Sequence, residues 1–459
     1  MDARAQHNAP LNQRYGRLLS CSIPCSGLNF AGFLAAAEGG ARFYWESQSG
    51  AVAFAGSGTA VELIAWGEGR YQEIERRARQ LFDGACLPDG ENRLTRPQLF
   101  GGFSFRGDFT PDNTWSIYAP AIFVLPHYQL VSSSGQMWLT INTQIPLDED
   151  PAPLMPDLRA ALHDKLAQLK ADAPELLNAA QSDLESIDYP MSADMWARMI
   201  TSATDRIRAG RLNKVVLARA AELRFSGRIR ILPILRYLAK TYADCYRFLF
   251  EARPYHAFYG ASPELLVSVQ GKRLATMALA GSIGRGSCVD EDQALGKALM
   301  NSAKDRLEHQ IVVDKLRDRL APLTETLEIP PVELLKLSNI QHLNTPISGV
   351  LKRPIGILPL VEALHPTPAM GGDPREDALQ LIRQLEPIPR GWYGAPVGRI
   401  DARLEGEFAV AIRSAVAQES RAWIYAGGGI VAESQPDLEW EESALKFRPM
   451  LDAHGSGEK

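Results

Sequence analysis

The sequence predicts a mixed α+β fold, and three observations support that prediction. Residues 41–145 contain short stretches in which polar and apolar side chains alternate between glycine turns, a pattern typical of β-strands. The second half combines similar strands with long stretches of helical periodicity. The strands rarely form the continuous apolar runs of a buried parallel sheet, which argues against an all-parallel architecture.

The composition is that of a globular chain with a sizeable core. Of 459 residues, 46% are hydrophobic and 22% are charged, which excludes a disordered tail protein, a collagen-like fibre and a coiled coil. With 49 Lys and Arg against 54 Asp and Glu, the net charge is −5, so no global basic field is available to bind nucleic acid. An anionic substrate must therefore be held by local cations.

No membrane or secretory segment is visible in the sequence. The longest apolar stretches, such as residues 121–125, are far shorter than the ~20 residues needed to span a bilayer. Residues 1–14 are polar and indicate a loose tail without an apolar signal region. The five cysteines are scattered without zinc or redox spacing, as in a reducing compartment (Cys21, Cys25, Cys86, Cys245 and Cys288). We therefore expect a cytoplasmic protein without nucleic-acid or membrane partners.

In the first half, the expected elements are short strands, one helix and a linker. Strands are expected at residues 42–45, 52–55 and 137–141. A helix at about residues 72–81 interrupts them. Residues 148–153 combine like charges with prolines, which oppose regular structure, so they are the best linker candidate. A helical stretch follows to about residue 180.

The second half is more strongly patterned. Ser192 can cap a helix that ends near Gly210. Further strands are expected at residues 214–223, 248–251, 265–269, 408–413 and 422–425. Long helices are expected at residues 290–320, 374–385 and 438–451.

Two charged residues fall where the local pattern indicates burial. Lys214 opens an apolar strand, where lost hydration disfavours its charged form and suits a general base. The alternative is a strand-end lysine whose amine reaches water. Glu264 lies in a turn that leads into an apolar strand, where a raised pKa would suit a general acid. The alternative is a carboxylate that caps the turn.

Carboxylates also fall on inward-facing positions of two helices. Glu308 shares the apolar face of its helix, although a pair with Lys304 is the simpler interpretation. On the last helix Glu439, Glu442 and Lys446 share one face, with a Glu442–Lys446 salt bridge as the alternative. Inward glutamates from separate helices, Glu308 and Glu442, would suit a hard cation such as Mg²⁺.

The glycine runs and histidines carry weaker signals. Gly427, Gly428 and Gly429 follow an expected strand, so their amides could hold a carboxylate. No glycine run matches a dinucleotide fingerprint or a P-loop, which argues against nucleotide binding. His342 and His365 are lone histidines, for which structural hydrogen bonding is the simplest interpretation.

Ordered motifs along the second half carry a family resemblance. They include Lys-Val-Val-Leu-Ala-Arg (214–219), Ser-Pro-Glu-Leu-Leu (262–266), Lys-Asp-Arg-Leu-Glu-His (304–309), His-Pro-Thr-Pro-Ala (365–369) and Glu-Trp-Glu-Glu-Ser-Ala-Leu-Lys (439–446). This series resembles the chorismate-utilising family of isochorismate, salicylate, anthranilate and aminodeoxychorismate synthases. The resemblance covers residues 190–450 strongly and is fainter upstream.

The resemblance implies an α+β, anthranilate synthase component I-like fold, with a two-layer, mostly antiparallel β core and helices packed outside. The expected organisation is a flexible tail (1–14), a β-rich subdomain (15–185) and a chorismate-binding catalytic region (186–455). The last two would form one continuous unit, so the linker at 148–153 would be a subdomain boundary only.

A few positions point to one branch of the family. Members that add an amine resemble one another in carrying glutamine where this chain has Lys214, and a lysine there fits activation of water. Ala280 stands where aminodeoxychorismate synthases often carry a nucleophilic lysine. The chain is therefore most similar to isochorismate synthases, with Ser282 for a common threonine and Gly428 for the usual alanine. Its long N-terminal part and the absence of fused domains favour the menaquinone type.

The resemblance then implies a role for each candidate residue. Lys214 would be the base and Glu264 the acid, with Mg²⁺ held by Glu308 and Glu442, and Glu439 holding metal-bound water. Chorismate would be bound by Ala280, Gly281, Ser282, His342, Thr345, Arg413, Tyr425, Gly427, Gly428, Gly429 and Lys446. The enzyme would act as a monomer or homodimer. A salicylate synthase, or a non-catalytic chorismate-binding subunit, is the alternative.

Overall fold

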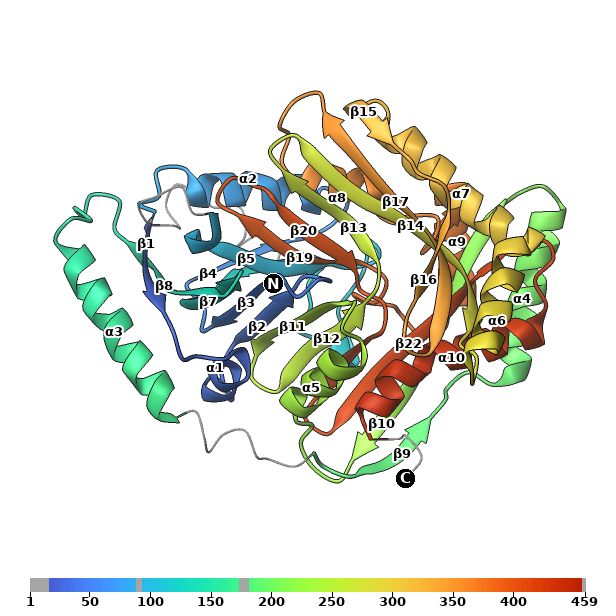
Figure 1. The fold of residues 1–459 in the computed structure, drawn as a ribbon, viewed down its shortest axis with the longest axis horizontal. Coiled ribbons are helices and arrows are strands. Elements are labelled where there is room, and N and C mark those ends of the chain that lie inside the picture. The colour runs from blue at the N-terminus through green and yellow to red at the C-terminus, as the bar shows by residue number, and fades with distance from the viewer. Residues whose placement is uncertain (1–15, 88–92, 173–180, 456–459) are drawn as a thin grey trace, which may run out of the picture.

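A computed structural model describes residues 16–87, 93–172 and 181–455, and two large antiparallel sheets dominate them (Figure 1). The predicted tail at 1–14 and the end of the helical stretch before residue 180 lie outside the described residues. In spatial order the first sheet contains β1 (Arg17–Cys25), β8 (Gln136–Ile145), β7 (Tyr128–Ser133), β3 (Val52–Ser57), β2 (Arg42–Glu46), β11 (Tyr246–Arg253), β12 (His256–Ser262), β21 (Ser414–Gln418), β22 (Arg421–Ile430), β10 (Lys214–Phe225) and β18 (Gly372–Asp373), with β9 (Leu184–Asp188) also paired to β10.

The second sheet likewise draws strands from both halves of the chain. Its order is β15 (Thr324–Glu328), β17 (Ile340–Leu351), β14 (Arg273–Gly284), β13 (Leu265–Gln270), β20 (Gly406–Val410), β19 (Pro396–Asp401), β5 (Gln98–Phe103), β6 (Ala121–Leu125) and β4 (Val61–Ala65), with β16 (Glu333–Lys336) paired to β17. The two-layer antiparallel core is therefore confirmed.

Aromatic side chains fill the space between the sheets. Phe43 on β2 of the first sheet stacks on Phe100 on β5 of the second, with ring centroids 6.2 Å apart. Phe54 on β3 meets the same ring edge-on at 6.3 Å. One continuous buried cluster contains these residues together with Phe408 on β20. The alternating apolar face of each strand thus becomes one shared core.

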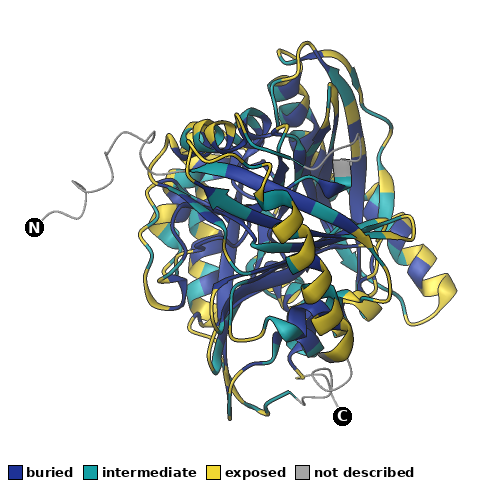
Figure 2. Cartoon of the chain, turned by 90° about the vertical axis from the view of Figure 1, so that its left-hand side faces the viewer, coloured by how far each residue is buried: buried dark blue, intermediate teal, exposed yellow. Residues whose placement is uncertain are grey.

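Helices cover the outer faces and leave their polar sides in water (Figure 2). They are α1 (Phe30–Ala36), α2 (Arg70–Phe82), α3 (Leu154–Asp172), α4 (Ala193–Arg208), α5 (Ile231–Thr241), α6 (Val289–Asn301), α7 (Ala303–Leu320), α8 (Leu358–Leu364), α9 (Arg375–Leu385) and α10 (Pro436–Ala453). A second buried cluster, with Leu162, Ile234 and Phe447 from α3, α5 and α10, packs these helices on the first sheet. In the described part of the chain, no helix is long and apolar enough to cross a membrane.

Most predicted elements are present, with three differences near the site. The predicted helix at 290–320 is two helices, because Ser302 ends α6 and its hydroxyl accepts the amide of Asp305 at the start of α7. The predicted strand at 408–413 ends at Val410. The glycines at 427–429 do not follow a strand but belong to β22, where they pair with 216–218 of β10.

Candidate active site

A small cavity of about 60 Å³ lies where β22 of the first sheet approaches β14 of the second. Helices α7 and α10 contribute to its walls, and so does the 412–413 segment before β21. Most residues predicted to act together line this cavity: Glu264, Ala280, Gly281, Ser282, Glu308, His342, Arg413, Gly427, Gly428, Gly429, Glu442 and Lys446. Sequence segments up to 182 residues apart are thus brought to one place.

Lys214 lies directly behind this lining, at the start of β10. Its side chain is fully buried, and Nζ lies 2.9 Å from Oε1 of Glu308. The solvent-reaching alternative is therefore wrong. This contact is an ion pair without the angles of a standard hydrogen bond, and the described residues offer Nζ no other acceptor. The close approach is possible because residue 429 is glycine: a Cβ there would lie 2.0 Å from Oε1 of Glu308.

Glu264 provides a protonated carboxyl in the cavity. It lies in the turn between β12 and β13 and is 3% exposed. Burial raises the pKa of Glu264 to about 8, against the opposing pull of Lys214, Arg413 and Lys446. At neutral pH this carboxyl therefore carries its proton and can donate it.

Three glutamates from two helices gather near the cavity, each paired with a lysine. Glu308 on α7 pairs with Lys214, as described above. Glu439 on α10 pairs with Lys304 at 2.7 Å, so the predicted alternative pair of Lys304 with Glu308 does not form. Glu442 pairs with Lys446 at 2.6 Å, as the salt-bridge alternative predicted, although both residues also line the cavity.

The glutamates are close enough to influence one another. Burial, and then the negative charge of Glu442, raises the pKa of Glu439. Burial also acts upward on Glu442, but Lys446 outweighs it and the pKa of Glu442 is lowered. Asp305, which sequence reasoning missed, has its pKa raised by burial and also by Glu308 and Glu442. The Lys-Asp-Arg-Leu-Glu-His motif already placed this carboxylate one helical turn before Glu308.

These oxygen donors fit a hard cation. Within the described ranges, no three carboxylate, imidazole or thiol side chains already surround one point. Oε2 of Glu439 is nevertheless buried without a hydrogen-bond partner among the described residues, and buried polar atoms normally have one. Carboxylate oxygens are the ligands that Mg²⁺ prefers. The donor set of Glu308, Glu439 and Glu442 is thus chemically suited to such an ion.

Cations and neutral polar groups also line the cavity. Arg413 is 6% exposed and adopts φ +50°, a backbone region that few non-glycine residues occupy. Lys446 Nζ donates to the carbonyl of Gly427 at 2.9 Å. Nδ1 of His342 bonds the hydroxyl of Ser282 at 3.0 Å, and its buried Nε2 has no partner among the described residues. Burial holds the pKa of His342 well below its usual range, so its ring is neutral.

Two predicted substrate-binding residues lie one layer behind the cavity. Tyr425 stacks on Tyr393, whose ring lines the cavity, at 5.0 Å, and its hydroxyl accepts a hydrogen bond from Trp115. Thr345 bonds Nε2 of His309 at 2.8 Å. His365 bonds the carbonyl of Phe105, in agreement with its structural interpretation. The sequence did not single out Tyr393, because the residues around it show neither the alternation of a strand nor the periodicity of a helix that would identify an inward-facing side chain.

Comparisons with known proteins concern the chain as a whole. The family model described as chorismate binding enzyme matches residues 4–455. The chain is 35% identical to isochorismate synthase MenF of Bacillus subtilis, over 96% of this chain and 93% of that protein. It is 38% identical to the salicylate biosynthesis isochorismate synthase of Pseudomonas aeruginosa, over 89% and 84% of the two chains.

Solved structures show the same fold. The menaquinone-specific isochorismate synthase MenF of Escherichia coli matches with a TM-score of 0.78 and 25% identity, over 97% of this chain and 96% of that one. Anthranilate synthase component I of Streptococcus pneumoniae matches with a TM-score of 0.68 at 20% identity, over 97% and 94%.

Proposed function

The chain belongs to the chorismate-binding enzymes, and on that premise we propose that it is an isochorismate synthase. The reaction adds water at C2 of chorismate and removes the C4 hydroxyl as the ring double bonds shift, so substrate and product are isomers. One group must accept a proton from the attacking water, and another must give one to the leaving hydroxyl. The observation that carries the proposal is that a fully buried lysine, Lys214, and a glutamate with a raised pKa, Glu264, lie at one small cavity.

Lys214 and Glu264 are suited to these two roles. The raised pKa of Glu264 leaves its proton available to the C4 hydroxyl at neutral pH. Lys214, in its neutral form, would accept the proton from water. Turnover is expected to fall as the pH rises past about 8, because Glu264 then loses the proton that it must donate.

The remaining lining residues would bind and orient the two carboxylates of chorismate. Arg413 and Lys446 supply positive charge, and the amides of β22 that face away from β10 supply neutral donors. Ser282 and the unpaired Nε2 of His342 offer further hydrogen bonds. Tyr425 and Thr345 would act from behind, by holding Tyr393 and His309 in place.

Mg²⁺ would be held by Glu308, Glu439 and Glu442. When bound, the ion would neutralise a substrate carboxylate and draw electron density toward it. A divalent cation bound by Glu308 would draw this carboxylate out of its ion pair with Lys214 and so leave the amine free to act as a base. This set of donors favours a divalent cation over a redox cofactor.

We further propose that the product serves menaquinone synthesis. The matches to the two MenF enzymes cover more than nine-tenths of each chain, which supports this choice. The relative from Pseudomonas aeruginosa is named for salicylate biosynthesis and is also an isochorismate synthase. The proposed reaction is therefore the same whether its product serves menaquinone or salicylate synthesis.

The direct test is to incubate purified protein with chorismate, with and without Mg²⁺, and to analyse the products by chromatography and mass spectrometry. We expect a Mg²⁺-dependent product of unchanged mass and no pyruvate. Salicylate with pyruvate would identify a salicylate synthase instead. Absence of any reaction would support a chorismate-binding subunit.

A second test addresses the base. Lys214→Met removes the amine at similar volume and is expected to lower kcat at least 100-fold while the circular dichroism spectrum is kept. Lys297→Met is the matched control, because Lys297 is exposed on the neighbouring helix α6. Unchanged turnover of Lys214→Met would remove this residue from the mechanism.

A further inference from the structure

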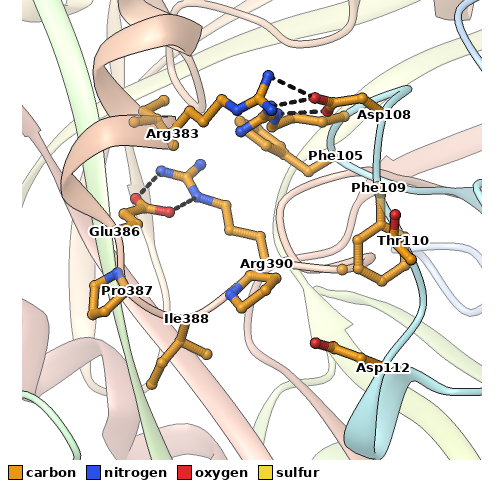
Figure 3. Close-up of a pocket in the computed structure, with 14 residues that line it drawn as sticks. Phe105, Asp108, Phe109, Thr110, Asp112, Arg383, Glu386, Pro387, Ile388 and Arg390 are labelled. Atoms are coloured by element: carbon orange, nitrogen blue, oxygen red, sulfur yellow. Dashed lines mark hydrogen bonds and ion pairs between the residues drawn. The ribbon is translucent and has the colours of Figure 1, made fainter.

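A second, larger cavity lies outside the candidate active site, and four arginines line it. Its volume is about 410 Å³, and it lies between the first turns of α2 and α9, the end of α8 and the loop after β5. We call it the arginine pocket, after Arg70, Arg106, Arg375 and Arg383. A neighbouring cavity of about 330 Å³ shares the wall formed by Phe105, Arg106, Asp108 and Arg383 (Figure 3).

Four carboxylates also line the arginine pocket (Glu68, Asp108, Glu362 and Glu376), but two of its arginines have no close carboxylate partner. Asp108 lies 2.6 Å from Arg106 and 2.9 Å from Arg383, and Figure 3 shows the second of these contacts. Arg375 donates to the carbonyl of Ala363 at 2.7 Å, and no described carboxylate lies within ion-pair distance of it. Arg70 donates to the carbonyls of Gly67 and Ser104 and to the hydroxyl of Tyr71, and the carboxylate that it approaches, Glu68, is 3.6 Å away.

The remaining carboxylates of this wall act on the arginines at longer range, and Glu362 and Glu376 stabilise the charge of Arg375 without forming an ion pair with it. The side chain of Glu68 is 86% exposed, so water screens its charge. Glu362 accepts a hydrogen bond from Gln72 at 2.6 Å. Glu376 lines the pocket but is exposed to solvent.

Arg70 is buried with an unused donor. Its side chain is 4% exposed, and its Nε has no hydrogen-bond partner among the described residues. A buried guanidinium without a carboxylate partner or a full set of acceptors is unfavourable. The neighbouring His365 cannot help, because burial and then the charges of Arg70, Arg375 and Arg319 hold its pKa well below the usual range.

Two helix N-termini add to the positive potential of the arginine pocket. Gly69 and Pro374 precede α2 and α9, and neither provides a side-chain hydrogen bond to the first turn. The unpaired amides and the helix dipole favour an anion at such ends. The acidic residues in these first turns, Glu73, Glu376 and Asp377, weaken that effect without supplying a partner for Arg70.

We propose that the arginine pocket is an effector site for a multivalent oxyanion, a phosphoryl or carboxylate compound other than the chorismate bound at the active site. Planar guanidinium groups bind either kind of oxyanion through paired hydrogen bonds. The pocket is connected to the active site by one short segment. His365 and Pro366 line the arginine pocket, whereas Ala369 and Met370 line the active-site cavity.

The structure also shows how an oxyanion would act on that segment. Arg319 does not line the arginine pocket, but the charge of Arg375 acts on it, and it donates to the carbonyl oxygens of Leu364 and Pro366, at 2.9 Å in both cases. An anion bound by Arg375 offsets the repulsion between these two arginines and so changes the hold of Arg319 on the start of the segment, and the effect is expected in the KM for chorismate. This readout rests on the proposed function, whereas binding of the oxyanion does not.

Binding is tested first, by titration calorimetry with inorganic pyrophosphate and, separately, with citrate. The buffer contains EDTA and no Mg²⁺, and KCl keeps the ionic strength constant. We expect saturable binding that Arg375→Gln weakens at least tenfold, because a charge-assisted pair of hydrogen bonds is lost. Arg383→Gln, on the exposed side of α9, is the second variant and is expected to weaken binding several-fold.

Two controls separate this site from others. Arg353→Gln removes an exposed charge in the loop after β17, and Arg413→Gln removes a cation of the active-site cavity. Neither is expected to change the affinity for the oxyanion. No saturable binding, or binding lost in Arg413→Gln and kept in Arg375→Gln, would overturn the proposal.

Coupling is tested second, with chorismate turnover at fixed free Mg²⁺. The oxyanion is expected to change the KM of the wild type at least twofold and to leave that of Arg375→Gln unchanged. An unchanged KM at saturating oxyanion would show that the pocket is not an effector site. A protein that binds the oxyanion but never converts chorismate would contradict the proposed function instead.

Discussion

At the scale of single residues, burial decides the chemistry of Glu264. The carboxyl forms no ion pair with a described residue, and three nearby cations fail to bring its pKa down to the usual range. The strand that follows the turn made burial predictable from sequence. The pairing of Lys214 with Glu308 was not predictable, because three lysines and three glutamates allow several pairings and only the fold selects one.

The raised pKa of Glu264 has a consequence for stability. Between pH 4.5 and about 8, the folded state holds a proton that the unfolded state releases, so this group destabilises the fold increasingly as the pH rises through that window. The slope is about 1.4 kcal/mol per pH unit and levels off above pH 8. Glu264→Gln removes this effect, so it is expected to be more stable than the wild type at pH 8 by a few kcal/mol.

Urea denaturation of Glu264→Gln and wild type at pH 5 and pH 8 measures the difference. Other titrating groups are shared by both proteins and cancel in the comparison. The same variant is expected to lose at least 100-fold in turnover, because an amide is a poor acid. A stability difference that is equal at both pH values would contradict the raised pKa.

Lys304 leads to a prediction about metal affinity. Its ammonium lies 2.7 Å from Glu439 and close to Glu442 and Glu308, where a divalent cation is proposed. The two cations would compete for the same oxygens. Lys304→Met is therefore expected to bind Mg²⁺ about fivefold more tightly, since a partly exposed ion pair contributes about 1 kcal/mol.

Calorimetric titration with Mg²⁺ in the absence of chorismate measures this affinity without using activity. Lys297→Met again serves as the control, because it removes an equal charge from α6. Weaker Mg²⁺ binding by Lys304→Met would show that Lys304 supports the site by holding Glu439.

At the scale of elements, β22 explains why the glycine run was interpreted incompletely. From sequence, the apolar strand was expected to end before the three glycines, and their amides were expected to hold a carboxylate. In the structure they continue the strand, because their pairing partners on β10 extend equally far. Glycine is needed there because the carboxylates of Glu308 and Glu439 occupy the space that a side chain at residue 429 or 428 would fill. Helices were easier to predict from sequence. Ser192 caps α4 as predicted, and the apolar side chains of Trp196 and Ile200 on one face of this helix are buried.

Gly428 and Gly429, near the end of β22, give a matched pair of variants. A Cβ at Gly429 would meet Oε1 of Glu308 at 2.0 Å and Cε of Lys214 at 2.7 Å. A Cβ at Gly428 would meet only Oε2 of Glu439, at 3.0 Å. Gly429→Ala is therefore expected to displace the Lys214–Glu308 pair and lower kcat about 100-fold, because small misplacements of reacting groups have effects of that size.

Gly428→Ala is the matched control, and its kcat is expected to stay within about threefold of the wild type. Thermal unfolding of both variants shows whether the strand is intact. Equal activity of the two alanine variants would mean that the space beside Glu308 is not needed for turnover.

At the scale of the whole molecule, the fold class was predictable and the strand order was not. Alternation and helical periodicity reveal elements, and the family resemblance implied two antiparallel layers. Neither shows that β2 lies beside β11, or β5 beside β19, since such pairings join residues far apart in the chain. These long-range pairings also mean that the predicted linker at 148–153 divides the sequence without dividing the sheets.

This interleaving predicts that the two halves of the chain do not fold separately. A cut between residues 180 and 181 would leave β2 and β11 without each other, and would expose the buried Arg42–Glu251 pair, whose atoms lie 2.6 Å apart. Breaking a buried ion pair and exposing the shared aromatic core are both strongly unfavourable. We expect fragments 1–180 and 181–459 each to lack near-ultraviolet circular dichroism, and the intact chain to unfold in one calorimetric transition. A cooperative melt of fragment 181–459 alone would instead establish an independent catalytic domain. The site residues, all of which this fragment contains, would then be held by the strands of that domain.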